Sequence, residues 1–92
     1  MHVVTRTYRS AEVANILLSK KDEVEKVIRG VPGLISWVLI RTGDSCMTAT
    51  ICQDKAGCDR SVQVAREWLS KNAPSTLSAP QVQEGEVLLR VT

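Results

Sequence analysis

The chain has 92 residues, enough for one small domain that buries about two thirds of the surface its unfolded form exposes. A hydrophobic content of 43% and a charged content of 24% are those of an ordinary folded protein and exclude a disordered or fibrous chain. The formal net charge of +2 is too small to indicate a nucleic-acid or anionic-membrane partner. We therefore expect a single domain over residues 1–92.

No stretch approaches the roughly 18 apolar residues of a membrane span, and the N-terminal residues lack the apolar centre of a signal peptide. We expect a cytoplasmic protein with no membrane partner. The three cysteines, Cys46, Cys52 and Cys58, have neither CxxC spacing nor a nearby histidine. The sequence therefore predicts reduced structural thiols and no metal, zinc site or disulfide framework.

The first third of the chain predicts a strand and then a helix. Residues 2–9 are rich in β-branched and aromatic types, which favour a strand. Ser10 is a helix N-cap candidate, and Gly30 with the Pro32-Gly33 pair ends the helix. The helical stripe lapses around Lys20, so the sequence leaves open whether this helix is continuous. Its apolar positions are Val13, Ile16, Leu17, Val24, Val27, Ile28 and Val31.

A hairpin follows, because residues 34–41 and 46–52 predict strands on either side of a Gly43-Asp44 turn. With these two residues at the tip, Arg41 lies opposite Cys46, and the alternation of each strand sorts the side chains into two sets. One set, predicted to be the floor beneath the helices, is Val38, Ile40, Met47, Ala49 and Ile51. The other set is Trp37, Leu39, Arg41, Thr48, Thr50 and Cys52.

The last third predicts a second helix and a final strand. Asp54 can cap a helix that ends near Asn72, and a loop follows at residues 73–80. Alternation over residues 86–91 predicts the final strand. The order strand, helix, strand, strand, helix, strand predicts an α+β, ferredoxin-like βαββαβ domain with a four-stranded antiparallel sheet and both helices on one face.

The other sheet face is predicted to be open. This assignment assumes that the first strand keeps its arginine out of the helix-packed core. A Trp-bearing open face on so small a protein predicts a partner surface or a cavity. The face would carry Arg6, Tyr8, Trp37, Leu39, Arg41, Thr48, Thr50, Leu88 and Arg90.

Two roles are predicted for this face. A dimer interface would use Trp37, Leu39 and Leu88. A ligand-binding cavity for a small aromatic or anionic molecule would use Arg6, Tyr8, Trp37, Arg41 and Thr50. Trp37 therefore belongs to both predicted sets. Trp37 either anchors the interface or stacks on a ligand. The arginines Arg6, Arg41 and Arg90 either hold an anion, or reach solvent or pair with Glu84 and Glu86.

Three short motifs resemble one family of small proteins. They are Val31-Pro32-Gly33-Leu34-Ile35-Ser36-Trp37, the turn Arg41-Thr42-Gly43-Asp44, and Asp54-Lys55-Ala56-Gly57. In these motifs the chain resembles the dimeric α+β barrel superfamily, and within it the antibiotic biosynthesis monooxygenase-like domains. The resemblance implies a homodimer in which two sheets pack their open faces together and enclose a small cavity.

The resemblance also implies a set of catalytic residues, which can be compared with the residues of this chain. Cofactor-free relatives use an Asn, a Trp and sometimes a Tyr to oxidise a polyphenol, and here Trp68, Trp37 and Tyr8 could stand in. No asparagine falls on a predicted strand, and the sole histidine, His2, is not the helical haem ligand of haem-degrading relatives.

Two functions follow, and the sequence leaves open whether the chain is an enzyme. The first is a small dimeric module that binds a small ligand without catalysis. The alternative is a cofactor-independent monooxygenase-like enzyme acting on a small phenolic substrate, which neighbouring positive charge would help to ionise. Neither function uses a cofactor. The common catalytic triads and glycine-rich phosphate loops are missing from the sequence, as are base-stacking aromatics on the third strand, so no nucleic-acid partner is expected.

Overall fold

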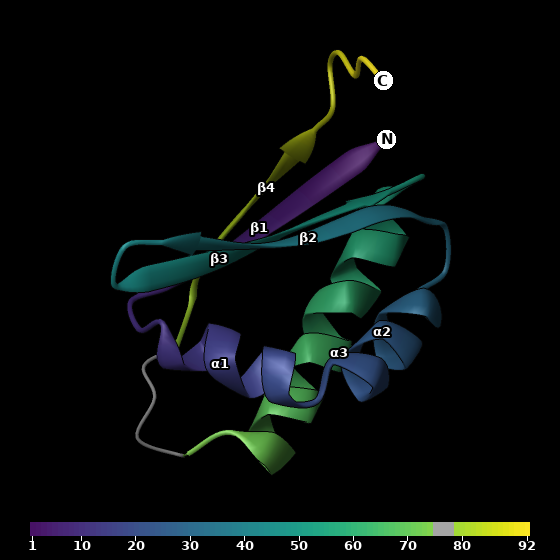
Figure 1. The fold of residues 1–92 in the computed structure, drawn as a ribbon. Helices are drawn as coiled ribbons and strands as arrows, with labels where there is room; N and C mark the ends of the chain where they lie inside the picture. The colour runs from purple at the N-terminus through teal and green to yellow at the C-terminus, as the bar shows by residue number, and fades with distance from the viewer. Residues whose placement is uncertain (75–78) are drawn as a thin grey trace.

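The chain forms a four-stranded antiparallel sheet with helices on one face, in a computed structural model that describes residues 1–74 and 79–92 (Figure 1). The strand order is β2-β3-β1-β4. This architecture confirms the predicted ferredoxin-like fold. In chain order the elements are β1 (His2–Tyr8), α1 (Glu12–Ser19), α2 (Lys21–Arg29), β2 (Leu34–Thr42), β3 (Ser45–Cys52), α3 (Lys55–Asn72) and β4 (Gln81–Glu86).

The predicted first helix is divided into two. α1 ends before Lys20, whose φ of −124° and ψ of 39° are not helical, and α2 begins at the next residue. The N-cap of α1 is Ala11, which makes no side-chain cap hydrogen bond, so the predicted cap at Ser10 is one residue too early. Ser10 Oγ still accepts a hydrogen bond of 3.1 Å from the N–H of Glu12. The apolar stripe lapses at the break, so nothing there holds one straight helix against the sheet.

The hairpin has the predicted register. Thr42 pairs with Ser45 across a Gly43-Asp44 tip, where Gly43 takes the positive φ of 61° that a tight turn requires. Arg41 therefore lies opposite Cys46, as the sequence predicts. α3 also begins as predicted, because the Asp54 carboxylate accepts a hydrogen bond of 3.0 Å from the N–H of Gly57.

The prediction of which sheet face the helices cover is wrong. Trp37 and Leu39 pack against the buried cluster formed by Tyr8, α1, α2 and Trp68 of α3, whereas Val38 and Ile40 remain 47% and 41% exposed on the other face. The helix-covered face of β1 and β3 consists of Val4, Arg6, Tyr8, Cys46, Thr48, Thr50 and Cys52, all buried. The set predicted as the floor, Val38, Ile40, Met47, Ala49 and Ile51, therefore lies on the open face.

Close packing explains the choice of face. The β3 side chains beneath the helices are small, and the start of α3 lies directly on them. A Cβ placed on Gly57 would lie 2.5 Å from the carbonyl oxygen of Pro32 and 2.9 Å from Cys52 Cβ. Such contact requires a small side chain at the position of Cys52 on the covered face.

The predicted position of the final strand is also wrong. β4 pairs with β1 from Gln81 opposite Thr7 to Glu86 opposite His2. Because β1 begins at His2, residues 87–92 have no strand beside them, and Val87 N–H bonds only to the Met1 carbonyl at 3.0 Å. Leu88 is 88% exposed, so it and Arg90 are not part of a sheet face. This end of the chain extends away from the helices (Figure 1).

Free thiols lie deep in the covered face. Cys46, Cys52 and Cys58 are fully buried and form no disulfide. No helix among residues 1–74 and 79–92 is long and apolar enough to cross a membrane.

Candidate functional site

Arg6, in the middle of β1, has its charge inside the protein. The side chain is only 5% exposed. Its Nη1 donates a hydrogen bond of 3.0 Å to the Val62 carbonyl of α3, but its Nε is buried with no acceptor among residues 1–74 and 79–92. Arg6 forms no salt bridge within the described part of the chain. Residues 75–78 are Ser, Thr, Leu and Ser and carry no carboxylate.

The alternation of β1 explains why Arg6 points inward. It shares a face with Val4 and Tyr8, and it lies opposite Thr48 on one side and Val82 on the other. Turning Arg6 outward would turn the other two residues outward as well, because the side-chain period of a strand is two. A buried guanidinium without a counter-charge costs folding energy, so this residue needs an explanation beyond packing.

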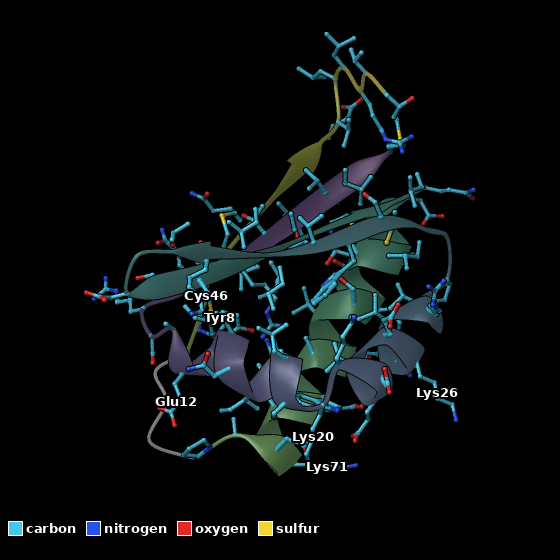
Figure 2. All side chains as sticks on the ribbon, viewed as in Figure 1. Tyr8, Glu12, Lys20, Lys26, Cys46 and Lys71 are labelled. Atoms are coloured by element: carbon cyan, nitrogen blue, oxygen red, sulfur yellow. The ribbon has the colours of Figure 1, made fainter. Side chains whose placement is uncertain are left out.

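Tyr8 is placed beside Arg6 on the same face. The Arg6 Cζ atom lies 5.7 Å from the centroid of the Tyr8 ring, within the range of a cation–π contact. Burial raises the pKa of the Tyr8 phenol, and the neighbouring Arg6 opposes this rise only in part. The phenol therefore keeps its proton at neutral pH. Figure 2 shows Tyr8 on the helix-covered side of the sheet, near α1.

A pocket of about 490 Å³ adjoins this pair. This volume is within the usual range for small-molecule sites, about 300–1,000 Å³. Arg66, on an exposed part of α3, contributes a second cation, and the described lining contains no acidic residue. Most of the remaining lining is apolar, from Val13, Val62, Leu69, Ala73, Pro74, Ala79, Pro80 and Val82, with the Ser70 hydroxyl.

A second, smaller cavity of about 40 Å³ lies beside Trp37. Tyr8, Leu17, Trp68 and Leu69 are among the residues that line it, and nearly all of the lining is apolar. The Trp68 indole donates a hydrogen bond of 2.9 Å to Glu23 Oε1, which fixes the ring against α2. This space is too small for an aromatic ligand unless the core rearranges.

The structure brings together only some residues of the predicted ligand cavity. Arg6 and Tyr8 line the larger pocket, while Tyr8 and Trp37 line the smaller one. Arg41 is exposed and its Nη2 donates to Asn15 Oδ1 at 2.9 Å, apart from both linings. Thr50 is buried opposite Val4 and lines neither cavity.

The residues predicted for the dimer interface are also separated. Trp37 and Leu39 pack beneath the helices, and Leu88 lies beyond the last strand. The argument for their interface role was that they share an open face, and that argument no longer applies.

Sequence reasoning missed the α3 side of the larger pocket. Arg66 follows Val62 by four residues and precedes Leu69 by three, so it lies on the edge of the apolar stripe of α3. An arginine at the edge of this apolar stripe was the sequence signal that could have identified the α3 side of the pocket. The β4 side, Pro80 and Val82, could not be placed while the strand was predicted five residues further on.

The buried thiols are poor candidates for chemistry. Burial and, to a smaller extent, the adjacent Cys58 raise the pKa of Cys52 to about 11. Burial also raises the pKa of Cys46. A protonated, buried thiol is a weak nucleophile. In residues 1–74 and 79–92, no group of three or more His, Cys, Asp and Glu residues could hold a metal ion.

Comparisons with known proteins identify the fold. No protein-family model and no curated protein matches the chain. Solved structures do match. A Nitrosomonas europaea protein of unknown function, NE2512, is similar at a TM-score of 0.76 and 20% identity, over 99% of this chain and 92% of that one.

Two further structures describe the kind of protein that has this fold. The monooxygenase ActVA-Orf6 of Streptomyces coelicolor, in complex with nanaomycin D, matches at a TM-score of 0.70 and 20% identity, over 99% of this chain and 90% of that one. A dimeric ferredoxin-like protein from an uncultured marine organism matches at a TM-score of 0.66 and 14% identity, over 99% of this chain and 95% of that one. The chain thus has the ferredoxin-like fold found in antibiotic biosynthesis monooxygenase-like proteins.

Proposed function

We propose that this protein binds a small ligand, without catalysing its conversion, in the pocket lined by Arg6 and Tyr8. The observation that carries the proposal is the buried Arg6, whose Nε has no acceptor and whose charge has no partner in the described chain. A folded protein keeps such a costly group where a ligand compensates for it.

The chemistry of the lining favours binding over reaction. An oxygenase acting on a phenol needs a group that takes up the phenolic proton. The polar side chains of the described lining are Arg6, Tyr8, Arg66 and Ser70. Arginine stays protonated, serine is no base at neutral pH, and the raised pKa of Tyr8 keeps its proton in place. These residues offer a ligand donors but offer it no base.

The test of binding uses an uncharged fluorescent probe, N-phenyl-1-naphthylamine. We expect saturable binding of one probe per chain, with enhanced fluorescence as the probe enters the apolar lining. Replacing Val82 by Trp should fill the pocket and abolish binding, because Val82 lines it and is 42% exposed. The matched control is Gln63→Trp, an exposed position on α3 outside the lining. Equal binding by both variants would contradict the assignment of this pocket.

We further propose that the protein is a homodimer in which two open sheet faces pack together. Three observations support a second copy as the occupant of this face. All three helices lie on the opposite side of the sheet (Figure 1). The open face carries apolar side chains along the hairpin, with Val38 and Ile40 of β2 half exposed. A dimeric protein of the same fold covers nearly the whole chain.

This interface differs from the one predicted from the sequence. Its centre is formed by the other face of the hairpin, together with Val3 of β1, which pairs with Ile51. The residues are Val3, Val38, Ile40, Met47, Ala49 and Ile51.

Sedimentation equilibrium tests the dimer. We expect the wild-type chain to be dimeric at micromolar concentration, and Ile40→Asp to be monomeric, because a carboxylate would be buried in the interface. Val82→Asp is the control, since Val82 is an equally exposed strand residue on the helix-covered face. A wild-type monomer, or a monomeric control, would refute this interface.

A further inference from the structure

The ligand pocket has a charge and a shape that narrow the class of its ligand. We infer that the ligand is an apolar molecule with a single carboxylate, which enters carboxylate first and ends at Arg6. The inference rests on the proposed binding function and adds the ligand class and its orientation.

The sign of the charge is the first step. The described lining carries two arginines and no Asp or Glu, and neither arginine forms a salt bridge with a described residue. A cation enclosed by low-dielectric walls attracts anions more strongly than one in water. A neutral or cationic ligand would leave the Arg6 charge uncompensated. The ligand is therefore an anion.

The depth of each residue sets the orientation. Arg6, Tyr8 and Val13 are buried and form the inner end of the pocket, whereas Arg66, Ser70, Pro74 and Val82 are exposed and form its rim. Between the two ends the lining is apolar, with Val62 and Leu69. A ligand that satisfies both ends has its anionic group inside and an apolar body reaching toward the rim.

The donors at the inner end select a carboxylate. A guanidinium presents parallel N–H groups that match two carboxylate oxygens, and one nitrogen of Arg6, Nη1, is already bonded to Val62. The protonated Tyr8 phenol adds one further donor. A phosphate dianion would need more donors than these.

The test compares three naphthalene derivatives of similar size, each displacing the uncharged probe: 2-naphthoate, 2-naphthamide and 2-naphthyl phosphate. We expect the naphthoate to bind about 10-fold to 100-fold more tightly than the uncharged amide, as one charge-assisted contact provides. The phosphate should bind more weakly than the naphthoate. These comparisons need only the wild-type protein, so they do not depend on whether a variant folds.

Variants then locate the contact. Arg6→Gln should abolish the preference for naphthoate over naphthamide while still binding the uncharged probe. Arg6→Lys, which retains the charge but not the paired N–H groups, should keep part of the preference. Arg41→Gln is the control, because Arg41 is exposed and outside the lining, and its preference should match wild type.

The outcomes distinguish a failure of the inferred ligand class from a failure of the proposed binding function. If the probe binds but the amide binds as tightly as the carboxylate, the ligand class is wrong and the binding function stands. Tighter binding of the phosphate also overturns the class. If Arg6→Gln keeps the full preference, Arg6 is not the contact. If the probe does not bind at all, the proposed function itself fails.

Discussion

Replacing Arg6 by Met should leave the protein as stable as wild type or make it more stable. An arginine kept for ligand binding is a cost to the unliganded fold, whereas an arginine kept for packing is a benefit. The two explanations predict opposite changes in the free energy of unfolding, and methionine is a suitable replacement because it is long, unbranched and apolar.

The magnitude follows from the contacts of Arg6. The substitution loses the hydrogen bond to Val62, worth about 1.5–3 kcal/mol for a charged donor, and a cation–π contact with Tyr8, worth about 0.5–2 kcal/mol. It removes the unsatisfied Nε, which costs about 1–3 kcal/mol, and the desolvation of the charge, which costs several kcal/mol more. We expect a change between zero and a gain of about 2 kcal/mol.

Urea denaturation followed by circular dichroism measures this change. The protein should first be refolded from denaturant, so that no ligand acquired during expression stabilises the wild type. Arg41→Met is the control, and its stability should stay within about 0.5 kcal/mol of wild type because Arg41 is exposed. If Arg6→Met lowers the free energy of unfolding by more than about 1 kcal/mol, Arg6 is a structural residue and the reasoning fails.

Three further predictions concern the scaffold. Gly57→Ala should destabilise the protein by about 2 kcal/mol in urea melts, because its Cβ would lie 2.5 Å from the Pro32 carbonyl oxygen. The control is Gly30→Ala, whose Cβ would lie 3.4 Å from the nearest atom and which should change the free energy of unfolding little. Asp54→Ala should cost about 1 kcal/mol through loss of the α3 cap, and an unchanged melt would contradict that role. Folding raises the pKa of Cys52 from 9.0 to about 11. The protonated Cys52 thiol therefore makes its full contribution to the free energy of unfolding below pH 9, and this contribution is lost as the pH rises toward 11. Stability should fall by up to about 3 kcal/mol over that range, and more steeply than in Cys52→Ala; parallel pH profiles for the two proteins would refute this.

The features that the sequence predicted correctly are set by neighbouring residues. A two-residue turn at Gly43-Asp44 determines the pairing of both hairpin strands, and the carboxylate of Asp54 caps the helix that begins at the next residue. Each of these interactions spans a few positions, so a short stretch of sequence contains all the necessary information.

The features that the sequence predicted wrongly depend on distant segments. Residues 86–91 alternate as a strand should, but pairing ends at Glu86 because β1 begins at His2. The choice of covered face depends on how closely α3 approaches β3 at Gly57, and no local pattern reports that distance. Both faces of the hairpin are apolar enough to be buried, so the hairpin pattern alone does not indicate which face the helices cover.

The error in the face of β1 and the proposal for the site have one origin. The assumption that a charged residue avoids the core predicts Arg6 on the open face, whereas Trp37 and Leu39 are expected there because the other side of the hairpin is predicted to be the floor beneath the helices. The structure places Arg6 inside, with no salt bridge and no acceptor for its Nε among the described residues. A general rule of folding is broken at one residue, and a pocket of suitable size and charge adjoins that residue. Since such violations persist in natural proteins mainly where they serve function, the residue that misled the assignment of the β1 face is the one on which we base the function.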